Sequence, residues 1–160
     1  MPGETERRAP RQEAAGRAVS LPLVQEFNAG SLYALRAAVS AHAAAAGVSR
    51  HRVYDITAAV HELAANAVLH GAGHGSLRLW AQDEYLWCAV ADDRATRNGD
   101  GPPVPGDARA HDADGSPWPV VHGHGLWMVG EIADDVRVDR GHAGTVITAR
   151  FAIHSDGDGR

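Results

Sequence analysis

Apolar residues recur at helical spacing in two consecutive stretches of the chain. The spacing predicts one helix from Ser31 to about Ala46 and a longer one from about Arg50 to His70. The longer helix carries an apolar stripe made of Val53, Ile56, Val60, Leu63 and Ala67. Gly47 favours the end of the first helix, Ser49 is a candidate N-cap for the second, and Gly71 stops the second helix.

Period-two alternation and short apolar runs predict the strands. Residues 76–81 alternate aliphatic side chains with others, which is the pattern of a half-buried strand. Tyr85 to Ala91 is continuously apolar, so this strand is expected at the centre of a sheet. Leu21 to Phe27 is predicted to be an edge strand, because Pro22 cannot donate a ladder hydrogen bond. The remaining predicted elements are a short helix from Gly125 to Ala133 and strands from Val136 to Arg140 and from Gly144 to Ile153.

The order of these elements predicts an α/β (α+β) two-layer sandwich. Its helices are expected to cover one face of a mixed, largely antiparallel sheet. Asp93 to His122 has five prolines and no periodicity, and a loop of that length in a compact domain is usually a functional lid or disordered. Residues 1–18 are predicted to form a disordered tail, 19–154 a single domain and 155–160 a flexible C-terminus.

Composition narrows the class of function. A net charge of −5 argues against generic binding to nucleic acid or to an anionic membrane. The chain has neither an apolar run long enough to span a membrane nor the apolar segment of a secretion signal, and Cys88 is its single cysteine, so a cytoplasmic location is expected. All 15 basic residues are arginine. A Walker P-loop and a protein-kinase strand both need lysine, so any use of ATP requires another fold.

The most suggestive motif runs from His61 to Gly71 and reads HELAANAVLHG. The zinc-protease motif H-E-x-x-H needs a second histidine one turn later, where this chain has Ala65. The phospho-acceptor box of sensor kinases follows His-Glu with a polar pair and a proline, whereas Ala64 and Ala65 follow here. The ten histidines show no recognisable metal-ligand spacing, so most are interpreted as scattered surface residues.

Glu62 and Asn66 share one helix face, because they are four residues apart. A carboxylate there can deprotonate a hydroxyl, and an amide oxygen can hold a Mg²⁺ ion that keeps most of its waters. Small alanines around the pair keep the surface low enough for a pocket. From this helix alone, an ordinary solvated face remains the stronger interpretation.

Three further features favour a nucleotide site. Asp92 ends an apolar strand, where its carboxylate can accept a hydrogen bond from an adenine amino group. Gly123-His124-Gly125-Leu126 leads from the long loop into a helix, and backbone amides at a helix start bind phosphate. Gly144 and Thr145 begin the last predicted strand. The glycine lets another group approach the backbone closely, and the threonine supplies a hydroxyl.

In this order, the motifs E-x-x-x-N-A, strand-ending Asp, lid, G-x-G-L and G-T-x-I resemble those of the GHKL, or Bergerat-fold, ATP-binding superfamily. The resemblance covers roughly residues 20–153, and HELAANAVLHG is a close match to the family's N-box. Within the superfamily the chain looks like the anti-sigma factor serine-protein kinases of Gram-positive bacteria, particularly the small actinobacterial members. Glu at position 62 is typical of the serine kinases and ATPases rather than of sensor histidine kinases.

The resemblance implies a role for each matched residue. Glu62 matches the general base, Asn66 the Mg²⁺ ligand and Asp92 the adenine-binding residue. Gly123, Gly125 and Leu126 match the phosphate-facing lid motif, and Thr145 the threonine near the adenine. It further implies ATP and Mg²⁺ as cofactors, protein serine/threonine kinase activity toward a STAS-domain anti-anti-sigma partner, binding of a sigma factor, and homodimerisation. No direct contact with nucleic acid or membrane is expected.

Two departures from the family pattern leave an alternative open. Arg94 stands where the family has a glycine that lets the backbone approach the base, and Val121 and His122 stand where kinase-active members carry a basic residue. Phosphoryl transfer depends on positioning and charge neutralisation, so these changes affect turnover more than binding. The alternative is a non-catalytic ATP-binding module that sequesters a sigma factor or another partner. A gyrase-type ATPase is disfavoured, because the chain contains no transducer domain.

Overall fold

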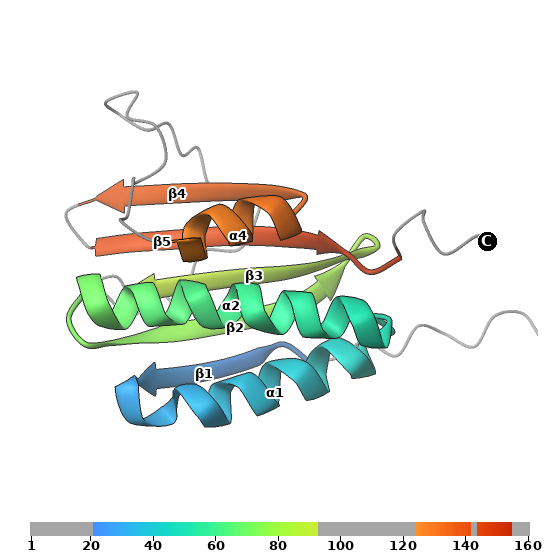
Figure 1. Cartoon of the computed structure of the whole chain (residues 1–160), viewed down its shortest axis with the longest axis horizontal. Helices are drawn as coiled ribbons and strands as arrows, with labels where there is room; N and C mark the ends of the chain where they lie inside the picture. Colours follow the sequence, from blue (N-terminus) through green and yellow to red (C-terminus); the bar gives the residue numbers. More distant parts are fainter. Residues whose placement is uncertain (1–20, 93–123, 142–143, 155–160) are drawn as a thin grey trace, which may run out of the picture.

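The computed structural model describes residues 21–92, 124–141 and 144–154, which form two layers. Within these residues, three α-helices lie side by side on one face of a five-stranded sheet (Figure 1). In chain order the elements are β1 (Leu23–Asn28), the 3-10 helix η1 (Ala29–Ser31), α1 (Leu32–Ala45), α2 (Arg50–His70), β2 (His74–Gln82), β3 (Tyr85–Asp92), α4 (His124–Ile132), β4 (Asp135–Gly141) and β5 (Gly144–Ala152). The predicted two-layer sandwich is therefore confirmed.

The sheet has the strand order β1-β2-β3-β5-β4, and each of the four pairings is antiparallel. The prediction of a mixed sheet was therefore too broad, while its largely antiparallel character is confirmed. β3 is the central strand and β1 is an edge, both as predicted. β1 begins at Leu23, immediately after Pro22, because proline cannot donate to the ladder.

Local sequence fixes where the helices begin and end. The Ser49 side chain accepts a hydrogen bond from the Arg52 backbone at 3.4 Å, so the predicted cap of α2 is present. Gly47 follows α1 with a φ of +91°, a left-handed conformation that glycine adopts without strain. Gly71 ends α2, and its backbone N–H donates to the Ala67 carbonyl at 3.0 Å. The strand β2 begins at His74, two residues before the predicted start.

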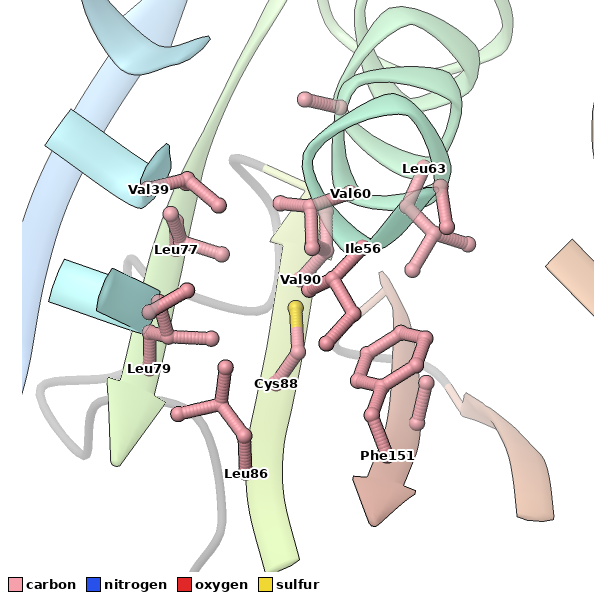
Figure 2. Packing of buried hydrophobic residues seen from close by; sticks show 14 of the residues in the cluster. Val39, Ile56, Val60, Leu63, Leu77, Leu79, Leu86, Cys88, Val90 and Phe151 are labelled. Atoms are coloured by element: carbon pink, nitrogen blue, oxygen red, sulfur yellow. The ribbon is translucent and has the colours of Figure 1, made fainter. Parts of the chain in front are cut away.

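The hydrophobic core lies between the helices and the sheet (Figure 2). Val53, Ile56, Val60 and Leu63 of the predicted stripe are buried, and Ala67 is partly buried against the same cluster. From the sheet, Leu77, Leu79, Leu86, Cys88, Val90 and Phe151 point toward α1 and α2. The described helices α1, α2 and α4 all lie on the face toward which these side chains point (Figure 1).

Some predictions concern residues outside the described ranges. These are the N-terminal tail, the lid loop from Asp93 to His122 and the C-terminal segment 155–160. Among the described helices, none combines the length and the apolar character needed to cross a membrane.

Candidate functional site

The candidate site lies where the inward-facing row of β3 changes from apolar to acidic. Leu86, Cys88 and Val90 point to the helices and are buried in the core. Asp92 is the next residue in that row, so its side chain follows theirs toward the helix layer. Only 9% of Asp92 is exposed. A carboxylate in that position is costly unless polar groups surround it, which makes this end of the sheet a candidate site.

Thr145 is the neighbour of Asp92 across the sheet. The Thr145 backbone N–H donates to Oδ2 of Asp92 at 3.3 Å. Gly144 precedes it with a φ of +123°, a conformation that favours glycine. The motif that opens β5 therefore holds one oxygen of the Asp92 carboxylate, and the two residues that the sequence singled out separately are brought together.

Two glycines allow backbone segments to approach Asp92 closely. A Cβ at Gly71 would lie 3.1 Å from the Asp92 Cβ and 2.4 Å from the Ala67 carbonyl oxygen. Gly75 pairs with Asp92 in the sheet, and a Cβ there would lie 2.3 Å from the Ala91 carbonyl oxygen. The end of α2 is thus held directly against the end of β3. The sequence pattern predicts only a helix stop at Gly71, and no local pattern points to Gly75.

Glu62 and Asn66 face the side of α2 on which α4 lies. Arg52 marks that side, because its guanidinium contacts Asp134 in the turn after α4. Asn66 follows Arg52 by 14 residues, two heptads, which places both near one line along the helix. Glu62 is one turn before Asn66 on the same side. Both are half-buried, and neither side chain has a hydrogen bond or ion pair with any described residue.

The Asn66 side chain has an unmet bonding capacity. Its Nδ2 atom is buried and has no hydrogen-bond partner among the described residues. Such a group is costly in a protein that binds nothing there, and it is stabilised when a ligand supplies the partner. Turning the amide over exchanges donor and acceptor, so this position can present its oxygen to Mg²⁺ or its N–H₂ to a phosphate oxygen. The residues at this end of the sheet therefore fit a magnesium nucleotide.

The helix α4 supplies a candidate phosphate site. It packs on α2 and runs antiparallel to it, with its N-terminal end toward the C-terminal half of α2 (Figure 1). Gly125 and Leu126 belong to its first turn, where backbone amides lack partners within the helix. The partial positive charge of a helix N-terminus favours phosphate. Gly123, the first glycine of the motif, lies outside the described residues.

His61 has no part in this arrangement. It lies about 140° around the helix from Asn66, since each residue turns an α-helix by about 100°. Its Nδ1 atom is buried without a hydrogen-bond partner among the described residues. Within residues 21–92, 124–141 and 144–154, no group of three His, Cys, Asp or Glu side chains is arranged to hold a metal ion.

A separate pocket of about 490 Å³ lies at the opposite end of the sheet. Its lining includes Arg52, Tyr85, Asp134 and Ala152. The Asp134 carboxylate already accepts from the Ala152 backbone at 2.7 Å and contacts the Arg52 guanidinium at 3.3 Å. Unlike the Asn66 region, this pocket has polar groups that bond to one another.

The fold is a two-layer α/β sandwich, and the candidate site residues Asn66, Asp92 and Thr145 lie at one end of its sheet. Comparison with protein families agrees. The family model of the histidine kinase-like ATPase domain matches residues 26–151, and the chain belongs to that family. The match includes all the predicted site residues, from Glu62 to Thr145. A comparison with curated proteins found no match.

Proposed function

We propose that this protein is an ATP-binding anti-sigma regulator with protein serine kinase activity toward a STAS-domain anti-anti-sigma protein. ATP binding is supported by membership of the histidine kinase-like ATPase family. The kinase assignment rests on one observation above all. The Glu62 carboxylate has no partner among the described residues, and it lies one turn from the unpartnered amide of Asn66.

The proposed division of labour follows from these positions. Asp92, held by the Thr145 N–H, accepts a hydrogen bond from the adenine amino group. The amides at the start of α4 receive phosphate oxygens. Asn66 contributes its amide oxygen to Mg²⁺, which neutralises phosphate charge when bound.

Glu62 then acts on the protein substrate. It accepts the proton of the partner's serine hydroxyl while the serine oxygen bonds to the γ-phosphorus and the bond to the β-phosphate oxygen breaks, releasing ADP. A general base needs an unoccupied acceptor, and a carboxylate already committed to an ion pair would serve poorly. The absence of any partner for Glu62 among the described residues supports this role.

The proposal is tested by measuring transfer of the labelled γ-phosphate of ATP to a STAS-domain protein encoded by a neighbouring gene. Glu62→Gln is expected to bind ATP as the wild type does and to lose about 100-fold or more of the transfer rate. Asn66→Ala is expected to lose Mg²⁺-dependent ATP binding. Unchanged transfer by Glu62→Gln would remove Glu62 as the base.

A non-catalytic regulator is the second candidate. It is supported by the sequence departures at Arg94, where the family has glycine, and at Val121, where active members carry a basic residue. This candidate predicts saturable ATP binding, capture of a sigma factor and no transfer to any STAS-domain protein. For either candidate function, we propose that the protein is cytoplasmic and forms a homodimer.

A further inference from the structure

Two large apolar side chains of the helix layer are exposed on either side of the candidate base Glu62. Leu69 on α2 is 75% exposed, and Trp127 on α4 is 69% exposed. A single exposed leucine is ordinary on a protein surface, whereas an exposed indole beside a candidate reaction centre is typical of a binding surface. The positions of both side chains relative to Glu62 indicate that they belong to one surface.

Leu69 lies on the same line of α2 as Glu62. The two residues are seven positions apart, so Leu69 is rotated from Glu62 by only about 20° around the helix. At about 1.5 Å of rise per residue, Leu69 is about 10 Å further toward the C-terminal end of α2. Ala65 lies between them, and its small side chain leaves the surface there low.

Trp127 reaches the level of Glu62 from the neighbouring helix. α4 runs antiparallel to α2 (Figure 1), and the Arg52 guanidinium contacts the Asp134 carboxylate at 3.3 Å, which aligns the two helices. Trp127 precedes Asp134 by seven residues. Ala59 follows Arg52 by the same number, so it lies at about the level of Trp127. Glu62 is three residues beyond Ala59, which at about 1.5 Å per residue is about 5 Å further along α2.

Glu62 and Trp127 both point away from the core. Val129 of α4 is fully buried, and Trp127 lies about 200° around the helix from it, because each residue turns an α-helix by about 100°. Glu62 has the same relation to Val60 of α2, which is also fully buried. The carboxylate and the indole therefore face outward from two helices that pack against each other.

We propose that Leu69 and Trp127 hold the segment of the partner protein that carries the acceptor serine, with one of them on each side of Glu62. This rests on the proposed function, since transfer to a protein hydroxyl requires a second protein to approach the base. A serine that gives its proton to Glu62 has its hydroxyl within about 3 Å of the carboxylate. The residues next to that serine must then lie over Leu69 and Trp127, which identifies the occupant.

The spacing of this surface specifies the class of substrate segment. An extended chain covers about 3.4 Å per residue, so about 10 Å from Glu62 to Leu69 corresponds to three residues. The distance of about 5 Å to the level of Trp127 corresponds to one or two residues. The acceptor segment is therefore expected to have an apolar side chain three positions from the serine on one side and one or two positions from it on the other.

The proposal is tested by titrating the full-length protein, loaded with Mg²⁺ and an ATP analogue whose γ-phosphate cannot be transferred, with the STAS-domain protein encoded by a neighbouring gene. Calorimetry measures the dissociation constant. Leu69→Ala combined with Trp127→Ala is expected to weaken partner binding at least about tenfold, because large apolar side chains, above all tryptophan, contribute much of the binding energy of an interface. Each single variant is expected to lose part of that affinity, and ATP affinity is expected to stay unchanged.

Tyr33→Ala is the matched control. Tyr33 is 86% exposed on α1, which lies on the other side of α2 from α4 (Figure 1), so this variant removes an exposed aromatic ring away from Glu62. Its affinity for the partner is expected to equal that of the wild type. Glu62→Gln is also expected to bind the partner normally while losing transfer. The double variant should instead raise the KM for the partner and keep kcat and the KM for ATP.

Several results would overturn the proposal. They are no binding of the partner by the wild type, unchanged partner affinity in the double variant, and an equal loss of affinity in Tyr33→Ala. Weaker ATP binding by the double variant would assign the two side chains to the nucleotide. A wild-type homodimer that the double variant abolishes, with partner affinity unchanged, would assign them to a second copy of the chain.

The same measurements separate this proposal from the proposed function. If the wild type binds the partner through these side chains but transfers no phosphate, the kinase function fails and the docking surface stands. If the wild type and the double variant bind the partner and transfer phosphate equally well, the docking surface fails and the kinase function stands.

Discussion

The two ends of the sheet are built from the same elements but differ in how their polar groups are paired. At one end, Asp134 accepts from the Ala152 backbone and contacts Arg52, which joins β5, α2 and the turn after α4. At the other, the Asp92 carboxylate accepts from the Thr145 amide, while the Asn66 Nδ2 atom is buried without a described partner. At the first end the Asp134 carboxylate has two partners, although the Arg52 Nε atom is buried without one among the described residues, whereas at the second end the Asn66 amide has bonding capacity left for a ligand. Stability and function are therefore expected to separate along one pair of strands.

The largest expected effect comes from Asp92→Asn. The amide keeps an oxygen for the Thr145 N–H but gives the adenine amino group a neutral, weaker acceptor. Loss of one charged hydrogen bond predicts about 10- to 100-fold weaker ATP binding, with little change in the free energy of unfolding. Calorimetric titration with ATP and GTP measures both affinity and base discrimination. Unaltered ATP affinity would remove Asp92 as the adenine reader.

The next effect concerns stabilisation by the ligand. ATP with Mg²⁺ at about 100 times its dissociation constant should raise the free energy of unfolding by about 2.7 kcal/mol. Asn66→Ala is expected to lose most of that gain, although the unliganded variant should be no less stable than the wild type, since the change removes a buried unpaired amide. Urea unfolding with and without the nucleotide measures the stability of the unliganded protein and the gain in stability from the ligand. A large loss of stability without ligand would show that Asn66 is structural.

A smaller effect is expected at the satisfied end. Asp134→Ala removes the acceptor of the Ala152 N–H and the contact with Arg52, and should lower the free energy of unfolding by about 1–2 kcal/mol. ATP affinity should stay within about twofold, because the site lies at the other end of the strands. Asp135→Ala is the neighbouring control, and loss of its exposed contact with Arg137 should cost under about 1 kcal/mol. A large loss of ATP affinity in Asp134→Ala would contradict the separation of stability at one end of the sheet from nucleotide binding at the other.

The smallest effect involves protonation of His42, in the last turn of α1. Burial lowers the pKa of His42 below its usual value of about 6.5, so the folded state favours the neutral imidazole. The unfolded chain then binds more protons between the two pKa values, and this contribution to stability is full above pH 6.5 and declines as the pH falls through the folded pKa. His42→Gln should flatten the fall in melting temperature between pH 7.5 and 5. An unchanged slope would contradict the assignment.

Local periodicity was enough to predict most of the fold. The stripe on α2 and the apolar run of β3 each face one environment along their length, so their spacing predicted both elements and the central position of β3. Strand order and the proximity of Asp92 to Thr145 depend on pairings across 53 residues, which no local pattern specifies. The resemblance to a family implied that Asp92 and Thr145 both lie near the adenine, but it gave no strand order.

Close packing and the burial of the sheet face that points away from the described helices were harder to predict. Gly75 makes room for the backbone of β3 and the Phe27 ring, a requirement visible only once the strands are paired. The row of Trp80, Trp87 and Arg150 crosses three strands, so its members are far apart in the chain. The alternation around Trp80 indicated the correct face of the sheet but not how deeply the ring is buried.

The single thiol lies at the centre of this molecule. Cys88 is fully buried in the middle strand, and burial raises the pKa of its thiol, so it is neither accessible nor ionised in the folded protein. A thiol reagent can modify Cys88 only after the central strand opens. When the reagent reacts more slowly than the strand closes again, the modification rate measures the opening equilibrium. The Cys88 thiol therefore reports the global unfolding of the protein in native buffer. Slower modification in the presence of a bound nucleotide or partner would reveal the binding of that ligand without any label.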